Sequence, residues 1–374
     1  MKTANIFRKT LALVSAALMT LTLAACSSQA PAATAAPAAE SAAPVESAAP
    51  AESAAAEETP AAAGKIYKVG IVKYVDDASL DQIEQSIQAE LDKKGAELGV
   101  TFDYADYTKN GQADSTTLNQ IAADLIADGV DVIIPIATPA ALIMQAATEE
   151  NAIPVVFSAV SDPVGAGLVD SLEAPGSNIT GTSDALNVEA VIDLMLAANP
   201  DLKKLGLLYD QGQDSSKSAI AAAKAYCETK GIETVEKTGT TNDELALAAD
   251  ALIAAKVDAV FTPTDNTVMT AELAIYEKFV DAKIPHYAGA DSFALNGAFC
   301  GYGVNYVTLG TSTADIAVDV LVNGAQPAST PVQIMSSGIA TVNTEVASAI
   351  GLDYSAFASL CEELKETITQ ENFN

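Results

Sequence analysis

Hydrophobic residues follow two alternating patterns from residue 67 onward. Short apolar runs rich in Val, Ile, Leu and Tyr are typical of buried strands, and longer segments with an apolar residue every third or fourth position are typical of helices. The predicted strands are 67–74, 100–107, 130–136, 153–159, 204–209, 232–237, 257–261 and 284–288, and the predicted helices are 79–98, 115–128, 139–150, 188–198, 215–230, 243–255 and 267–281. This alternation predicts an α/β fold with parallel sheets covered by helices on both faces.

The alternating pattern occurs twice. The strand at 130–135 begins Val-Asp and ends in Pro before a helix at Thr138-Pro139, and the strand at 257–263 begins Val-Asp and ends in Thr-Pro before a helix near Asp265. Two doubly wound lobes joined by a hinge follow from this repeat. Because ligands bind at the carboxyl ends of parallel strands, we expect a ligand cleft between the lobes.

The first 25 residues are typical of a secretory signal. A basic start with Lys2, Arg8 and Lys9 precedes the apolar run 11–23, which is shorter than the ~20 residues needed to cross a bilayer. The exit, Leu23-Ala24-Ala25-Cys26, resembles the bacterial lipobox. That resemblance implies cleavage before Cys26 and a diacylglycerol on its thiol, which would anchor the protein to the outer face of the cell membrane through its acyl chains. The alternative is an ordinary signal peptide with a Cys at this position by chance.

Residues 26–64 follow as a predicted tether. After Cys26 they consist almost entirely of Ala, Pro, Ser and Glu, with no aromatic residue, Lys or Arg. Such a segment cannot bury enough apolar surface to offset the entropy of ordering. We expect a disordered spacer, with a partly helical stalk as the alternative.

Composition excludes several functions. The 374 residues include 19 Lys and Arg against 49 Asp and Glu, a formal charge of −30, which would repel nucleic acid. A single histidine, His286, argues against imidazole catalysis and multi-histidine metal sites. With no Gly-x-Ser-x-Gly or Walker A motif, we expect no enzyme, no metal and no cofactor. Cys227, Cys300 and Cys361 form no C-x-x-C pair and are expected to be buried, with one disulfide as the alternative.

The loops after the predicted strands contain the candidate binding residues. They are 135–141, 157–164, 181–184, 209–216, 262–266 and 289–292. In the first loop, Thr138 is predicted to cap the next helix, so that the free amides of Ala140 and Ala141 could hold an anion. Acids in later loops, among them Asp184, could pair with a ligand ammonium. Ordinary helix capping is the alternative in each case.

These loops resemble those of a known family, the tryptophan/tyrosine-type substrate-binding lipoproteins of bacterial ABC transporters. The matching segments are 69–75 with Leu80-Asp81, Ala137-Thr138-Pro139-Ala140, Ser161-Asp162-Pro163-Val164, 178–184, Thr264-Asp265-Asn266, Gly303-Val304-Asn305-Tyr306 with Leu309-Gly310, Pro331-Val332, Val342-Asn343-Thr344 and Ile350-Gly351-Leu352. The resemblance implies the type I periplasmic-binding-protein fold and capture of a free amino acid, often aromatic, for an ABC permease and its ATPase. His286 and the tail after Leu352 depart from the family pattern, and neither is expected to touch the pocket.

A zwitterionic ligand needs an anion seat, a cation seat and a side-chain slot. We assign the α-carboxylate to Thr138 and to the amides of Ala140 and Ala141, helped by Ser158. The α-ammonium is assigned to Asp265, beside Asn266, with Asp184 and Asp291 as alternatives. Tyr74 and Tyr209 each end the first strand of a lobe and are expected to sandwich a flat side chain, with packing at the rim as the alternative.

The expected lobes are 65–183 with 292–327 and 184–291 with 328–374, with hinges near Ser183, Ala290 and Gln326. The helix at 306–324 should return to the first lobe, and the protein should act as a monomer. A sugar or nucleoside binder of the same fold and a ligand-sensing lipoprotein remain alternatives. The absence of Trp weakens the sugar alternative, because sugar sites favour Trp stacking.

Overall fold

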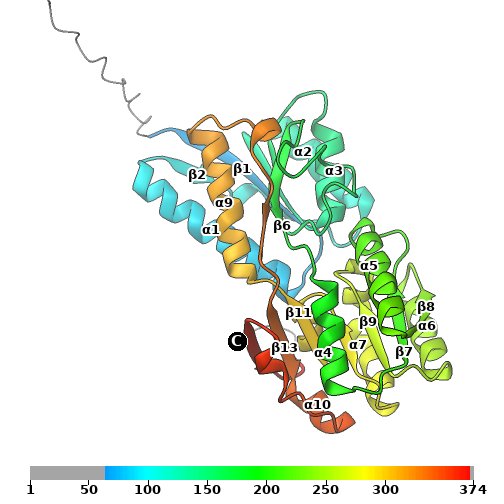
Figure 1. The fold of residues 1–374 in the computed structure, drawn as a ribbon. Coiled ribbons are helices and arrows are strands. Elements are labelled where there is room, and N and C mark those ends of the chain that lie inside the picture. The colour runs from blue at the N-terminus through cyan, green and yellow to red at the C-terminus, as the bar shows by residue number, and fades with distance from the viewer. Residues whose placement is uncertain (1–63, 371–374) are drawn as a thin grey trace, which may run out of the picture. The chain divides into compact units, whose positions relative to one another are not determined.

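The computed structural model describes residues 64–370, which lie in one compact unit built around two seven-stranded sheets (Figure 1). The predicted signal peptide (1–25), Cys26 and nearly all of the tether lie outside the described residues. We call the part built on the first sheet lobe 1 and the part built on the second sheet lobe 2. The α/β prediction with two parallel-sheet lobes is confirmed.

Lobe 1 has the strand order β12-β6-β5-β4-β1-β2, with β3 also paired to β1, and every pairing in it is parallel. Helices α1 and α9 pack together on one face, and α2 and α3 pack together on the other (Figure 1). Its elements are β1 (Ile66–Lys73), α1 (Ala78–Leu98), β2 (Thr101–Asp103), β3 (Thr108–Asn110), α2 (Ser115–Asp128), β4 (Val132–Ile136), α3 (Thr138–Thr148), β5 (Val155–Phe157), β6 (Ile179–Ser183), α9 (Tyr306–Val322) and β12 (Gln333–Ile334).

Lobe 2 has the order β14-β13-β11-β10-β9-β7-β8, in which only the β11–β13 pairing is antiparallel. Helices α4 and α5 cover one face, and α6 and α7 the other. Its elements are α4 (Val188–Ala198), β7 (Lys204–Tyr209), α5 (Asp214–Lys230), β8 (Glu233–Thr238), α6 (Asn242–Ala254), β9 (Ala259–Thr262), α7 (Asn266–Asp281), β10 (His286–Ala288), α8 (Asp291–Leu295), β11 (Cys300–Gly303), β13 (Ile339–Asn343), α10 (Thr344–Ile350) and β14 (Glu363–Thr367). Three short 3₁₀ turns are Ala105–Tyr107, Pro327–Ser329 and Phe357–Ser359.

Strand β1 shows why an apolar run forms a central strand. Successive side chains point to opposite faces of a sheet. Val69 and Ile71 therefore join the core under α1 and α9, whereas Val72 joins the core under α2 and α3. Burial on both faces explains why the run is continuously apolar instead of alternating.

The chain crosses between the lobes three times. The first crossing follows β6 and agrees with the expected position near Ser183. The second lies between β11 and α9, because β11 pairs with β10 and so keeps residues 292–303 in lobe 2. The third lies between β12 and β13, because β12 pairs with β6 in lobe 1. The expected crossings near Ala290 and Gln326 were therefore wrong, and α9 returns to lobe 1 as expected.

The misplaced second crossing has a physical cause in the sequence of β11. Cys300-Gly301-Tyr302-Gly303 contains two glycines, which normally weaken a strand. Here Gly301 is required, because a Cβ on it would lie 2.1 Å from the carbonyl oxygen of Ala290. Because β11 lies so close to the backbone at Ala290, it contains glycines in place of the continuous apolar run that predicts the other strands.

Two further features bear on earlier expectations. Cys227 and Cys300 are buried and Cys361 is partly buried, and all three are free thiols. Within residues 64–370, no helix combines the length and the hydropathy needed to cross a bilayer.

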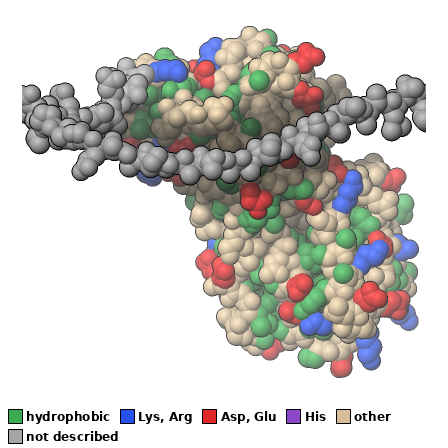
Figure 2. All heavy atoms as spheres, turned by 45° about the horizontal axis from the view of Figure 1, so that its top comes forward, with side chains coloured by type: hydrophobic (Ala, Val, Ile, Leu, Met, Phe, Trp, Pro, Cys, Tyr) green, Lys and Arg blue, Asp and Glu red, His purple; other side chains and the backbone are tan. Residues whose placement is uncertain are grey.

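On the face shown in Figure 2, Asp and Glu side chains are spread over both lobes, with Lys and Arg interspersed among them.

Candidate ligand site between the lobes

A small cavity lies where the carboxyl ends of both sheets meet. Lobe 1 contributes Asp77, Ser79, Thr138 and Ser161 to its wall, the first crossing contributes Asp184, and lobe 2 contributes Ser215, Thr264, Asp265 and Asn266. The cavity has a volume of about 20 Å³, which is roughly the room that one water molecule needs. The lobes therefore lie closed upon each other.

Direct contacts hold the lobes together at this cavity. The Ser79 hydroxyl donates to Asp291 Oδ1 at 2.5 Å, and the Ser292 amide donates to Ser79 Oγ at 3.2 Å. Leu80 of lobe 1 and Met269 of lobe 2 line the cavity and belong to one buried apolar cluster. Polar and apolar contacts of this kind exist only while the lobes are together.

The N-terminus of α3 differs from the prediction. The N-cap is Ala137, not Thr138, and it offers no side-chain hydrogen bond to the helix. Ala137 adopts φ +80°, a conformation that L residues rarely take and that often marks functional sites. Thr138, the first helical residue, is only 2% exposed, and its hydroxyl has no hydrogen-bond partner. No side chain therefore caps this end of α3.

The two alanine amides behave differently from each other. The Ala141 N–H donates to the Ala137 carbonyl at 3.1 Å, so it is not free for a ligand, contrary to the prediction. Ala140 precedes the first intrahelical donor, so its N–H belongs to the open end of the helix. The side chains of both residues pack into the cores of lobe 1.

The N-terminus of α7 is fully capped by Asp265. Its Oδ1 accepts the amides of Thr267 at 3.0 Å and Val268 at 2.9 Å, and its Oδ2 accepts the Asp210 amide at 2.8 Å and the Ser216 hydroxyl at 2.6 Å. Burial raises the pKa of Asp265 to about 6. The carboxylate lines the cavity as predicted, but these four bonds use its acceptor capacity.

Asn266 is the first residue of α7, directly after the N-cap Asp265. It lines the cavity, and its amide nitrogen donates to Gln213 Oε1 at 3.1 Å. Together with Asp265, it joins the loop after β9 to the loop after β7. Both predicted residues therefore reach the cavity, where they also hold lobe 2 loops in place.

Two more acids, Asp77 and Asp184, line the cavity, and Asp291 lies beside it. Asp184 is 4% exposed and accepts a hydrogen bond from Ser161 Oγ at 2.9 Å. Burial raises the pKa of Asp184, Asp77 and Asp291 to about 6 each. Tyr306 also lines the cavity, and its pKa rises because it is buried and near these three carboxylates. Since no Lys or Arg is among the lining residues described, the cavity has a negative potential that suits an ammonium.

Several predicted residues do not line this cavity. Ser158 is fully buried and bonds to Thr313 Oγ1 at 2.8 Å in the core of lobe 1. Tyr209 packs in the core of lobe 2, and its hydroxyl donates to Glu236 at 2.8 Å on another side of that lobe. Neighbouring Leu208 joins the opposite core, so strand alternation turns Tyr209 away from lobe 1. The predicted tyrosine sandwich is therefore wrong for this arrangement.

Tyr74 and Asp291 occupy intermediate positions. Burial raises the pKa of Tyr74, and so do the carboxylates of Asp210 and Asp265 in lobe 2. Asp291 accepts the hydroxyl of Ser79 beside the cavity without being part of its lining. Both residues face the lobe boundary, outside the cavity itself.

Sequence reasoning missed some lining residues. Asp77 caps α1 by accepting the amides of Ser79 and Leu80, a signal that an acid before a helix start can provide. Ser161 and Ser215 lie in two of the loops that had been singled out, but they were not chosen as binding residues. Ser215 is 3% exposed, and its hydroxyl has no partner. Like Thr138, it lies in the first turn of a helix that begins at the cavity.

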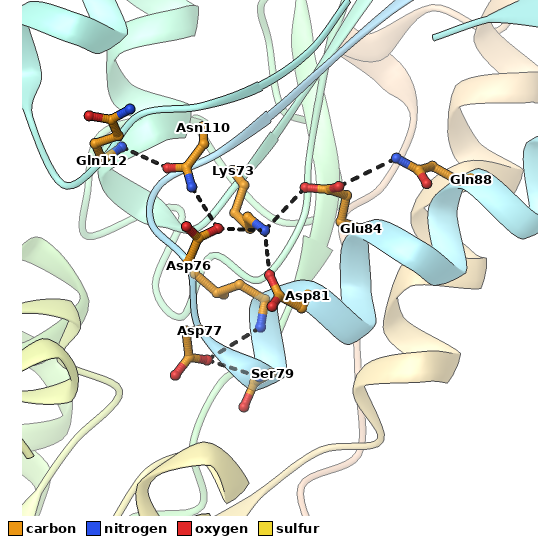
Figure 3. Close-up of polar contacts among 10 residues, drawn as sticks. Lys73, Asp76, Asp77, Ser79, Asp81, Glu84, Gln88, Asn110 and Gln112 are labelled. Carbon is orange, nitrogen blue, oxygen red and sulfur yellow. Dashed lines mark hydrogen bonds and ion pairs between the residues drawn. The ribbon is translucent and has the colours of Figure 1, made fainter. Parts of the chain in front are cut away.

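A buried lysine holds the β1–α1 loop, which carries Asp77 and leads into the first turn of α1 with Ser79. Figure 3 shows Lys73, at the end of β1, facing three carboxylates: Asp81, Asp76 at 3.1 Å and Glu84 at 3.4 Å. Burial lowers the pKa of Lys73, but the hydrogen bond to Asp81 and the charges of its partners outweigh this and raise it to about 12. The ammonium thus ties the β1–α1 loop to the strand.

The single histidine lies away from the cavity. His286 is 2% exposed, with Nδ1 2.9 Å from Glu272 Oε1 and Nε2 2.8 Å from Thr262 Oγ1. It does not line the cavity, as expected. Within residues 64–370, no three His, Cys, Asp or Glu side chains are grouped to hold a metal ion.

Comparison with known proteins identifies the family. Residues 68–360 match the family model described as ABC transporter substrate binding protein. The chain belongs to this family. Its members are solute-binding proteins that work with a membrane permease outside the cytoplasm, so the substrate-binding protein described here has the role that its loops had suggested.

Three similar proteins have a curated description or a solved structure. The substrate-binding protein is 31% identical over 286 residues to a tyrosine-binding protein of Clostridioides difficile, covering 76% of this chain and 81% of that protein. It is 30% identical to an ABC domain from Streptococcus pneumoniae in complex with L-Trp, with a TM-score of 0.74 over 80% of this chain and 100% of that one. A ligand-free, open substrate-binding protein with adhesive properties from Clostridium difficile is 32% identical, with a TM-score of 0.62 over 81% and 100%.

Proposed function

We propose that this substrate-binding protein captures a free aromatic amino acid, such as tryptophan or tyrosine, by closing its lobes. The observation that carries the proposal is the lining of the cavity. One wall has an uncapped helix end with a buried, unpartnered hydroxyl, and the same cavity has buried carboxylates without a basic partner in the lining described. A zwitterion supplies the anion and the cation that these two features lack.

The α-carboxylate is assigned to the N-terminus of α3. Thr138 Oγ1 and the first amides of the helix are donors, and the helix dipole favours a negative charge there. The unpartnered hydroxyl of Ser215 at the start of α5 supplies a second donor from lobe 2. A carboxylate between these two helix ends would therefore draw the lobes together.

The α-ammonium is assigned to Asp184. Among the acids that line the cavity, Asp265 already accepts four hydrogen bonds, whereas Asp184 accepts one from the side chain of Ser161 and one from its own backbone amide. Because a carboxylate has about four acceptor sites, Asp184 can also accept from an ammonium without breaking an existing bond. Asp265 keeps a supporting role by shaping the loop after β9.

Closure is assigned to the three crossings. The described lobes superpose better on the L-Trp complex, with a TM-score of 0.74, than on the ligand-free open relative, with 0.62, at similar identity. This difference supports a closed arrangement here and an open one before the ligand enters. The closed form would be recognised by the permease.

The anchor and the assembly state belong to the same proposal. The lipobox Leu23-Ala24-Ala25-Cys26 supports a diacylglycerol on Cys26 and a tether through residue 64, which would hold a monomer at the outer face of the membrane. Metabolic labelling with a radioactive fatty acid, compared between the natural chain and Cys26→Ser, tests the anchor directly.

Thermal denaturation with candidate ligands tests the function. A ligand at a hundred times its dissociation constant stabilises the protein by about 2.7 kcal/mol, which raises the melting temperature by several degrees. We expect this with tryptophan, tyrosine or phenylalanine, and not with ribose, inositol or nucleosides. A shift with a ribose-containing compound alone would contradict the proposal.

A further inference from the structure

A second compartment opens directly beside the cavity. It has a volume of about 360 Å³, within the range of ~300–1,000 Å³ usual for small-molecule sites. Ser161, Ser215 and Thr264 line both spaces. A molecule held at the cavity can therefore extend past these three residues into the compartment.

The walls of the compartment are mainly apolar and come from both lobes. Val164, Leu172 and Ile334 belong to lobe 1, Leu186 lies on the first crossing, and Ala219 and Ala222 project from α5 of lobe 2. The two alanines leave a smooth, small-residue wall on the helix. Such a surface suits a flat apolar group better than a sugar, whose hydroxyls need polar partners.

The two spaces differ in capacity. The cavity, at about 20 Å³, has room for roughly one water, so even a slight opening that admits an ammonium and a carboxylate leaves no room there for an aromatic ring. The compartment has the room and the apolar walls that the ring requires. The unpartnered Ser215 hydroxyl lies at their junction, where it can bond the head group of a ligand that spans both.

We propose that this compartment is the side-chain slot, in which Leu186, Ala219 and Ala222 contact the aromatic ring and set ligand size. The inference rests on the proposed function, because it assumes an amino-acid head group in the cavity. It replaces the tyrosine sandwich expected from Tyr74 and Tyr209 with walls from the first crossing and α5. The size of residue 219 then determines which side chains fit.

Filling the slot tests the inference. Ala219→Phe adds a ring to the α5 wall, and Ala225→Phe makes the same change at an exposed position of the same helix outside the compartment. Calorimetric titration should show tryptophan binding to Ala219→Phe at least about tenfold more weakly than to the wild type, since even one methylene changes apolar-pocket selectivity by 10–200-fold. Ala225→Phe should bind as the wild type does.

The size of the ligand separates a filled slot from obstructed closure. A filled slot should weaken tryptophan more than the smaller phenylalanine, whereas obstructed closure should weaken both by the same factor. Equal factors, or unchanged tryptophan binding by a folded Ala219→Phe variant, would overturn the inference while leaving amino-acid capture intact. Failure of the wild type to bind any aromatic amino acid would instead contradict the proposed function, and the slot with it.

A measurement without any variant covers the case in which Ala219→Phe does not fold. The chain contains no Trp, so light absorbed only by indole reports on the ligand tryptophan alone, and with protein in excess nearly all of it is bound. The proposal expects its emission to move to shorter wavelength on binding, as for a ring in apolar surroundings. Emission at the wavelength of free tryptophan in water, with binding shown by calorimetry, would place the ring outside the compartment and overturn the inference.

Discussion

The helix ends at α3 and α7 occupy equivalent places in the two lobes, yet they are completed in opposite ways. In lobe 2, Asp265 caps α7 and accepts four hydrogen bonds from its own lobe. In lobe 1, α3 has no side-chain cap, and the hydroxyl of Thr138 is buried without a partner. A repeated sequence pattern has thus produced one helix end that is saturated and one that is open.

This contrast distinguishes a helix end that stabilises its own lobe from one that can bind a ligand. A group whose hydrogen bonds are all satisfied within its own lobe gains little from a ligand, whereas an unsatisfied buried donor costs free energy until a partner arrives. The open end at α3 is therefore where an anion contributes most. The saturated end at α7 keeps the opposing wall in shape.

The largest expected effect is on the saturated end. Asp265→Ala removes the N-cap of α7 and leaves the Asp210 amide and the Ser216 hydroxyl without their acceptor. We expect the free energy of unfolding to fall by about 3–5 kcal/mol, measured by denaturant titration.

Asn is also a good N-cap, so Asp265→Asn is the matched control and should lose much less stability. If Asp265 were instead a dedicated ammonium partner, Asp265→Ala would keep its stability and lose only ligand affinity. That outcome would remove the contrast between the two helix ends.

The next effect concerns Asp184, the acid to which the ligand ammonium is assigned. Burial raises the pKa of Asp184 from 3.8 to about 6, so the folded protein holds this proton more tightly than the unfolded chain. Stability from this group is present at acidic pH and is lost as pH rises from about 4 to about 6, by at most about 3 kcal/mol. Asp184→Asn cannot ionise and escapes this loss.

For Asp184→Asn at pH 7, the melting temperature should therefore rise while the affinity for the amino acid falls. In thermal denaturation without ligand, the variant should match the wild type near pH 4 and melt a few degrees higher at pH 7. At pH 7 it should also bind the amino acid more weakly, because it has lost the charge assigned to the ammonium. An unchanged affinity would return the ammonium to Asp77 or Asp265.

Much of the fold was predictable because its information is local. The apolar runs at 67–74 and 130–136 and the helical spacing at 79–98 correspond to β1, β4 and α1, since burial of one strand or one helix face leaves its period in the sequence. Strand β11, with two glycines, and the charged edge strand β14 carry no such period. Their places depend on backbone pairing with β10 and β13, which leaves no side-chain period in the sequence.

The candidate site was predictable to the level of loops but not of individual atoms. Of the residues predicted from strand-end loops, Thr138, Asp184, Asp265 and Asn266 line the cavity, and their contact with a ligand stays a prediction. Whether Asp265 is free depends on Ser216 and the Asp210 amide, which approach it from another loop, and no spacing in the sequence shows that. The direction of Tyr209 likewise depends on the register of β7 within its sheet.

The smallest expected effect sharpens the contrast from the open side. Thr138→Val keeps the shape of the side chain but removes its unpartnered hydroxyl, so the free energy of unfolding should stay the same or rise slightly. Affinity for the amino acid should fall by about ten- to a hundredfold, the value of one hydrogen bond to a charged carboxylate.

Thr313→Val is the matched control, because its buried hydroxyl already bonds to Ser158 and Thr182 inside lobe 1. This control should lose stability and keep its affinity, the reverse of Thr138→Val. If both variants lost stability and neither lost affinity, the uncapped end of α3 would be an accident of packing, and the carboxylate would have to be held at α5 instead.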